Sequence, residues 1–198
     1  MSERSPLITR PATELNPRRA FLKQTGLISL TAVAMGLVSV KPGWAMPKAG
    51  PSPENDIAVL NSALALEYEG IAAYQVGAES GLLKKPVLAV AVKFQSQHKA
   101  HAHLLAQTIT KLGGTPVEAR RSAEYGFPVD QLKTQADVLQ FAAGLEKGAA
   151  SAYLVSVPLF YNRDLAKAAA SILGDETMHW AVLRNVLGQD PVPVAFVS

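Results

Sequence analysis

The sequence E-Y-E-G-I-A-A-Y at residues 67–74 has a counterpart in E-K-G-A-A-S-A-Y at residues 146–153. Each stretch begins with Glu and ends seven residues later with Tyr, and most of the residues between them are small. Because a helix completes a turn in about 3.6 residues, positions seven apart lie on one face. The two stretches therefore predict two related helices, each presenting a Glu and a Tyr on the same side.

A second motif accompanies each stretch at a nearly constant distance. Glu176 and His179 form a Glu-x-x-His motif, and the residues 78 positions earlier are His98 and His101. A Leu follows the second histidine by four residues in both copies. Four positions that keep an offset of 78 or 79 residues through unrelated sequence indicate that the chain contains two copies of one helical hairpin.

Local signals predict four long helices and no sheet. Ser and Thr residues stand at helix starts, Gly residues stand at helix ends, and no segment alternates apolar and polar residues as a strand does. The expected helices cover residues 53–80, 86–112, 134–157 and 162–188, and a polar stretch at 115–133 has no clear structure. Two hairpins joined by one longer crossover predict an all-α fold, an antiparallel four-helix bundle.

The Glu and His side chains fall on the apolar, core-directed faces of these helices. A buried carboxylate costs several kcal/mol unless it is paired or bound to a metal. Six Lys and Arg residues of the helices fall on other faces: Lys93, Lys99, Lys111, Lys147, Lys167 and Arg184. A bound cation is therefore expected as the neutralising group, and carboxylate with imidazole, without thiolate, favours Fe, Mn or Zn.

The chain resembles the ferritin-like superfamily, and in particular exported bacterial ferritin-like domain proteins related to plant desiccation-related proteins. The resemblance covers residues 54–196. It rests on A-L-A-L-E-Y at 63–68, F-Q-S-Q-H-K-A-H-A-H-L-L at 94–105, I-L-G-D-E-T-M-H at 172–179 and P-V-P-V-A-F at 191–196. In di-iron members, one Glu from each of two helices joins a Glu-x-x-His from each of the other two. The resemblance thus implies a metal site formed by Glu67, Glu146, Glu176, His101 and His179.

His98 departs from that pattern, because it stands where the second bridging glutamate is expected. The replacement removes one negative charge, so the site is expected to hold one or two ions of Fe, Mn or Zn, and His98 is either a further ligand or a core histidine. Tyr74 and Tyr153 are candidates for hydrogen bonds to the ligand carboxylates. His103 and Glu69 point elsewhere and are expected to face solvent, as are Arg120 and Arg121.

The sequence leaves two functions open. One is an exported metalloprotein whose iron or manganese centre reacts with O₂ or peroxide, as an oxidase, ferroxidase-like enzyme or scavenger in stress or iron handling. The other is a bundle with a degenerate, metal-poor site that acts as a structural or binding module. The oligomeric state is equally open, with a homodimer as one alternative.

Residues 1–45 have the features of an export signal. N-P-R-R-A-F-L-K at 16–23 resembles a twin-arginine signal, and an uncharged, mostly apolar run follows at 27–40. That run is shorter than the roughly 20 residues of a membrane-spanning helix, so no stable membrane anchor is expected, although an anchor or a helix of the fold is the alternative. The expected division is a signal peptide at 1–45, a linker at 46–53 and the bundle at 54–196, with the twin-arginine export machinery as a partner and the periplasm as destination.

Composition excludes several other classes of protein. The chain of 198 residues has no cysteine, which excludes disulfide scaffolds, Fe–S clusters and covalently attached haem. Residues 1–45 hold six of the 19 Lys and Arg residues and two of the 16 Asp and Glu residues. The remainder has 13 basic and 14 acidic residues, so the basic character belongs to the leader and nucleic-acid binding is not expected.

Overall fold

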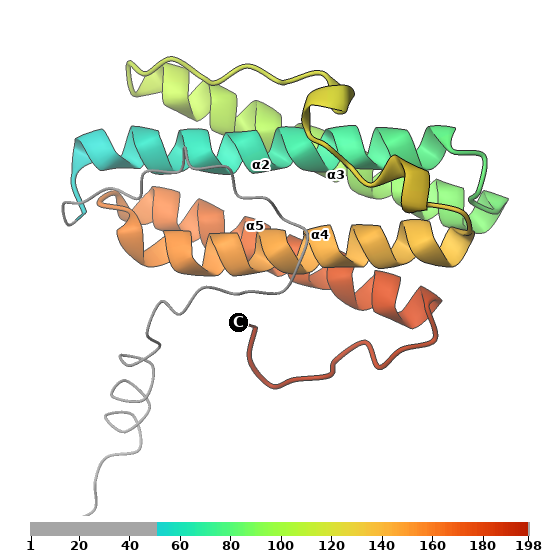
Figure 1. Ribbon diagram of the computed structural model, residues 1–198. Helices are drawn as coiled ribbons and strands as arrows, with labels where there is room; N and C mark the ends of the chain where they lie inside the picture. Colours follow the sequence, from blue (N-terminus) through green and yellow to red (C-terminus); the bar gives the residue numbers. More distant parts are fainter. Residues whose placement is uncertain (1–50, 198) are drawn as a thin grey trace, which may run out of the picture. The chain divides into compact units, whose positions relative to one another are not determined.

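The computed structural model describes residues 51–197 and confirms an all-α bundle of two helical hairpins (Figure 1). The predicted signal peptide lies outside the described residues. Helices α2 and α3 form the first hairpin, and α4 and α5 form the second. Their bounds are α2 Pro53–Glu79, α3 Lys85–Lys111, α4 Gln135–Ser156 and α5 Arg163–Val186.

The helices begin and end where the predicted local signals stand. The hydroxyl of Ser52 accepts a hydrogen bond from the Asn55 amide, 3.3 Å away, at the start of α2. Thr134 and Asp137 cap α4 reciprocally, each side chain accepting from the other residue's backbone N–H. Gly81 follows α2 with a φ of 70°, a conformation that strains residues with a Cβ. Helix α4 ends at Ser156, within one residue of the expected end, because the chain tightens into the 3₁₀ turn Val157–Leu159 at Pro158.

The crossover between the hairpins, which comes after α3 in the chain, runs alongside α2. The side chain of Asn61 donates to the Thr115 carbonyl at 3.1 Å and accepts from the Val117 amide at 2.8 Å. The crossover contains two 3₁₀ turns, Ser122–Glu124 and Val129–Gln131, where no structure was expected. Glu69 is half-buried, so the expectation that it faces solvent is wrong. Burial raises the pKa of this carboxyl, and the charge of Arg120 opposes the rise.

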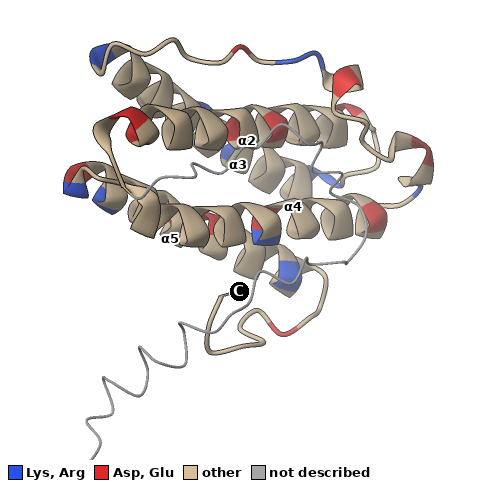
Figure 2. Cartoon of the chain, turned by 60° about the vertical axis from the view of Figure 1, so that its left-hand side comes forward, with Lys and Arg blue, Asp and Glu red and all other residues tan. Residues whose placement is uncertain are grey.

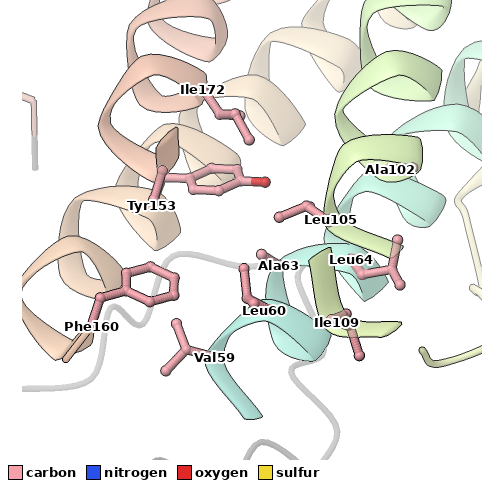
Figure 3. Close-up of a cluster of buried hydrophobic side chains, with 11 residues drawn as sticks. Val59, Leu60, Ala63, Leu64, Ala102, Leu105, Ile109, Tyr153, Phe160 and Ile172 are labelled. Carbon is pink, nitrogen blue, oxygen red and sulfur yellow. The ribbon is translucent and has the colours of Figure 1, made fainter. Parts of the chain in front are cut away.

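Two apolar clusters fill the bundle, one toward each end. The first includes Leu60, Leu105, Tyr153 and Ile172, and Figure 3 shows Tyr153 reaching from α4 into the interior. The second includes Tyr74, Phe94, Leu139, Trp180 and Leu183. Along α2, α4 and α5, the Glu and His positions of the repeat fall between the residues of the two clusters. The bundle thus encloses the polar groups between two apolar layers, which limits the access of water. Among the described residues, no helix has the length and apolar character needed to cross a membrane.

Candidate metal centre

Each of the four helices contributes side chains to one buried polar cluster. Glu67 comes from α2, Glu146 from α4, and Glu176 with His179 from α5, and these four residues are at most 2% exposed. Helix α3 contributes His98, which is 3% exposed, and His101, which is half-buried. The structure therefore brings together all six residues predicted as metal ligands. We call these six residues the Glu/His cluster.

The cluster divides into two overlapping groups with the spacing of metal ligands. One ligand atom from each of Glu67, His98, His101 and Glu176 lies within 4.8 Å of the others, and the same holds for His98, Glu146, Glu176 and His179. His98 and Glu176 each belong to both groups. The Oε1 of Glu176 is 3.2 Å from His101 Nδ1, and its Oε2 is 3.5 Å from His179 Nδ1. Glu176 therefore has the position of a carboxylate that bridges two ligand sets.

Five buried polar atoms of the cluster have no hydrogen bond: His101 Nδ1, His179 Nδ1, Glu146 Oε2, and both carboxylate oxygens of Glu176. Buried polar atoms are almost always hydrogen-bonded, so a group of convergent exceptions requires an explanation. Imidazole nitrogen and carboxylate oxygen are both ligands of Fe, Mn and Zn. The residues present therefore fit a divalent metal ion.

His98 differs from the other histidines, because both of its ring nitrogens face carboxylates. Nδ1 lies 2.8 Å from Glu67 Oε2, and Nε2 lies 3.3 Å from Glu146 Oε1. Gly70 makes room for the ring, since a Cβ there would lie 3.2 Å from it. His98 thus connects the carboxylate of the first hairpin to that of the second.

The three histidines supply positive charge that Lys and Arg do not. Burial alone lowers the pKa of His98, but hydrogen bonds and charges of the neighbouring carboxylates outweigh it and raise the pKa to about 11. The same balance raises the pKa of His101 and of His179 to about 9. Among residues 51–197, no Lys or Arg lies within 4.0 Å of the three carboxylates. The sequence had indicated a metal ion as the counter-charge. The structure offers a second one, because three imidazolium rings also balance three carboxylates.

Two tyrosines form hydrogen bonds across the hairpins to Glu67 and Glu146, which we call the lone glutamates because neither belongs to the Glu-x-x-His motif or its counterpart. The Tyr74 hydroxyl on α2 donates to Glu146 on α4, and the Tyr153 hydroxyl on α4 donates to Glu67 on α2 at 2.5 Å. Burial and the charges of the nearby carboxylates raise the pKa of both phenols well above the ordinary value, so both remain donors. The reciprocal pairing fixes one oxygen of each lone glutamate.

Two residues that the sequence reasoning missed orient the histidines from outside. Asp175 Oδ2 lies 3.3 Å from His101 Nε2 and 3.5 Å from His179 Nε2. His179 Nε2 also donates to Gln97 Oε1, 3.1 Å away. A proton held at Nε2 leaves Nδ1 as the nitrogen that can bind a metal. Asp175 stands four residues before His179, and this helical spacing was the available signal.

The remaining predicted positions lie outside the cluster. His103 is exposed, as expected from its place on α3, and Arg120 and Arg121 are exposed in the crossover. Phe94 covers His179 on one side, with ring centroids 4.0 Å apart and planes inclined by 23°. This contact adds apolar surface beside the histidine and restricts its ring orientation.

Comparison with known proteins agrees with this architecture. The family model described as a ferritin-like domain matches residues 55–189. A conserved hypothetical protein from Mycobacterium tuberculosis is 25% identical with a TM-score of 0.62, and the match covers 73% of this chain and 99% of that one. A ferritin-like, diiron-carboxylate protein from Bacillus anthracis is 26% identical with a TM-score of 0.58, over 68% and 96% of the chains.

A dodecameric thioferritin from Bacteroides fragilis, described as a bacterioferritin-related protein, shares the fold at 22% identity. Its TM-score is 0.57, and the match covers 70% of this chain and 87% of that one. None of the curated proteins matches this chain.

Proposed function

Since the chain belongs to the ferritin-like domain family, we propose that its Glu/His cluster binds divalent iron or manganese and reacts with O₂ or peroxide. The observation that carries the proposal is the set of five convergent, buried polar atoms without hydrogen bonds. The similarity to a protein described as diiron-carboxylate supports the class of metal site. When bound, such a metal supplies electrons to the oxidant through a change of its own oxidation state.

The two ligand sets are unequal, and one ion is expected to bind more tightly than a second. His179 Nδ1, Glu146 Oε2 and Glu176 Oε2 form a set in which every atom lacks a hydrogen bond. In the other set, His101 Nδ1 and Glu176 Oε1 converge, but Glu67 Oε2 is already hydrogen-bonded to His98. A metal ion in that set must displace His98 from Glu67, so the set that contains His179 and Glu146 is the stronger site.

The protein's own residues give the proposed centre its order and its isolation from water. Tyr74 and Tyr153 restrict the lone glutamates, while Asp175 directs the Nδ1 atoms of two histidines toward Glu176. Prior ordering of ligands lowers the entropy lost on binding. The apolar clusters on either side limit the access of water to the site, which strengthens electrostatic interactions within it.

Metal analysis of the dialysed protein tests the proposal. The full chain, loaded anaerobically with Fe(II) and separately with Mn(II), should retain about one ion, with a weaker second one. Glu176→Gln combined with His179→Gln should abolish retention, because it removes the bridging carboxylate and a nitrogen ligand. The metal should also raise the unfolding midpoint, since a ligand at 100 times its Kd stabilises the folded state by about 2.7 kcal/mol.

The matched control is Glu69→Gln combined with His103→Gln, which changes the same residue types on α2 and α3 outside the cluster. It should retain metal like the unaltered chain. Circular dichroism establishes that both double variants remain helical. Equal retention by the two variants, or no retention and no stabilisation by Fe, Mn or Zn in the unaltered chain, would reject the proposal.

One observation favours a second function, a metal-poor structural or binding module. His98 is hydrogen-bonded to both lone glutamates, and three imidazolium rings balance the cluster without a metal. Under this reading, the protein isolated from its own cells contains no stoichiometric metal. Elemental analysis of that material separates the two functions.

We also propose that the protein is exported to the periplasm by the twin-arginine route. Support comes from the twin-arginine motif and the short apolar run within residues 16–40. Proteins on that route fold before export, which would allow metal loading in the cytoplasm. The mature protein should disappear from the periplasm of cells lacking the twin-arginine translocase, and an unchanged periplasmic amount would exclude the route.

A further inference from the structure

A second site candidate lies away from the Glu/His cluster, between the second hairpin and the C-terminal segment, where Val194 is 57% exposed. A pocket of about 270 Å³ is bounded by α4, α5 and residues 193–197. Helix α4 contributes Gly144 and Lys147, and α5 contributes Trp180 and Arg184. Its volume is near the lower end of the range of about 300–1,000 Å³ that small-molecule pockets occupy. The space suits a ligand with a single ring.

The pocket combines an aromatic wall with two basic side chains. The Lys147 Nζ lies 5.9 Å from the centroid of the Trp180 ring, and the Arg184 Cζ lies 5.4 Å from it. Arg184 Nε donates to the Asp190 carbonyl at 2.6 Å, which anchors the guanidinium group next to the pocket. Figure 2 shows basic segments of the bundle close to the C-terminal segment.

Within the part of the chain that the structure describes, these positive charges have no acidic counterpart. No Asp or Glu lines the pocket, and within residues 51–197 no carboxylate lies within 4.0 Å of Lys147 or Arg184. The rest of the wall is largely apolar, with Ala143, Pro193 and Val194 among its residues. A ligand that complements the pocket therefore needs a negative charge and a flat apolar body.

We propose that this pocket binds a small aromatic carboxylate. Its ring would contact Trp180 and the apolar wall, and its carboxylate would pair with Lys147 and Arg184. Arginine in particular matches the planar geometry of a carboxylate. No residue of the pocket belongs to the Glu/His cluster, so this binding does not depend on the proposed metal function.

Fluorescence titration with benzoate tests the proposal directly. The chain has two tryptophans, so in the full chain carrying Trp44→Phe the emission comes from Trp180 alone. Benzoate should change this emission saturably, with a Kd below about 10 mM. Lys147→Gln and Arg184→Gln should each weaken binding about fivefold, as expected for a partly exposed charge pair. Calorimetric titration provides a readout that does not depend on the indole environment.

Two glycines of α4 provide a matched pair of variants. A Cβ at Gly144 or at Gly148 would meet no atom within 4 Å, so a side chain can begin at either position without a clash. Gly144 lines the pocket, whereas Gly148, about one turn further along, does not. Gly144→Leu should therefore fill the pocket and abolish benzoate binding, while Gly148→Leu should leave it unchanged.

Several results would overturn the proposal. These are the absence of saturable binding, equal binding by the two Leu variants, and equal binding of benzyl alcohol, which lacks the charge. Inorganic phosphate that binds more tightly than benzoate would assign the pocket to a different class of anion. Circular dichroism of the Leu variants excludes unfolding as the reason for a loss.

Discussion

Replacing His98 with Glu should turn an unequal site into one that holds two metal ions. In the metal-free protein, His98 is hydrogen-bonded to Glu67 and Glu146 at 3% exposure. Removing one partner of a buried ion pair costs about 3–5 kcal/mol. Because 1 kcal/mol shifts the unfolding midpoint of a chain of this size by about 2–4 °C, the metal-free variant should melt roughly 6–20 °C lower.

Metal should reverse this loss. The substitution releases Glu67 Oε2 from its hydrogen bond and adds a fourth carboxylate beside His101. Four carboxylates balance two divalent cations, whereas three leave one positive charge in excess. His98→Glu should therefore bind about two Mn(II) ions where the unaltered chain binds about one tightly, and Mn(II) should raise its midpoint more than that of the unaltered chain. Elemental analysis after dialysis and thermal unfolding with Mn(II) or a chelator measure both effects.

His98→Gln is the matched control, because it removes the imidazole but adds no carboxylate. Its metal content should stay near one ion. Two results would contradict this prediction: His98→Glu binding no more metal than His98→Gln, or the unaltered chain already binding two ions with equal affinity. The former result would mean that a group other than His98 limits the binding of the second metal ion. The latter would show that His98 leaves Glu67 readily.

Three further outcomes follow from the same contacts. Asp175→Asn should weaken metal binding about 10- to 100-fold, measured by competition with a chelator, whereas Asp164→Asn in the exposed first turn of α5 should not. Tyr153→Phe should lower the unfolding free energy by about 1.5–3 kcal/mol, because Glu67 loses a buried donor; chemical denaturation measures this, and an unchanged midpoint would contradict it. The raised histidine pKa values stabilise the metal-free fold, and this contribution is complete below pH 6.5. It should disappear as the pH rises through about 9 and then 11. The midpoint of thermal unfolding should therefore fall over that range unless a divalent metal ion is bound.

The sequence predicts the helices of this protein well because their signals are local. Ser52 and Thr134 act as caps in the structure, and Gly81 has the positive φ expected at a helix end. The repeat identifies which helix faces meet, since a face carrying both Glu and Tyr beside apolar residues has to be buried. These features depend on residues within two turns of one another.

Contacts across helices were harder to predict. Nothing in the helical period of α5 indicates that Asp175 reaches a histidine of α3, because this depends on how the two helices are placed. Glu69 is half-buried because the crossover runs alongside α2. The path of a segment without hydrophobic periodicity cannot be predicted from its composition. The pocket at Trp180 likewise depends on the fold of the C-terminal segment.

His98 explains why the repeat alone does not settle the chemistry. A histidine at the position of a carboxylate removes a negative charge and also introduces a group that can become positive, so the two effects add. In a bundle with four carboxylates and two histidines, two negative charges would lack a partner even with both rings protonated, and a metal would be required. With three of each, the metal-free cluster is neutral when every imidazole is protonated, as the raised pKa values favour. A metal ion then has to displace protons from the imidazole rings and is not required for charge balance. Metal affinity should therefore depend steeply on pH between neutrality and pH 9.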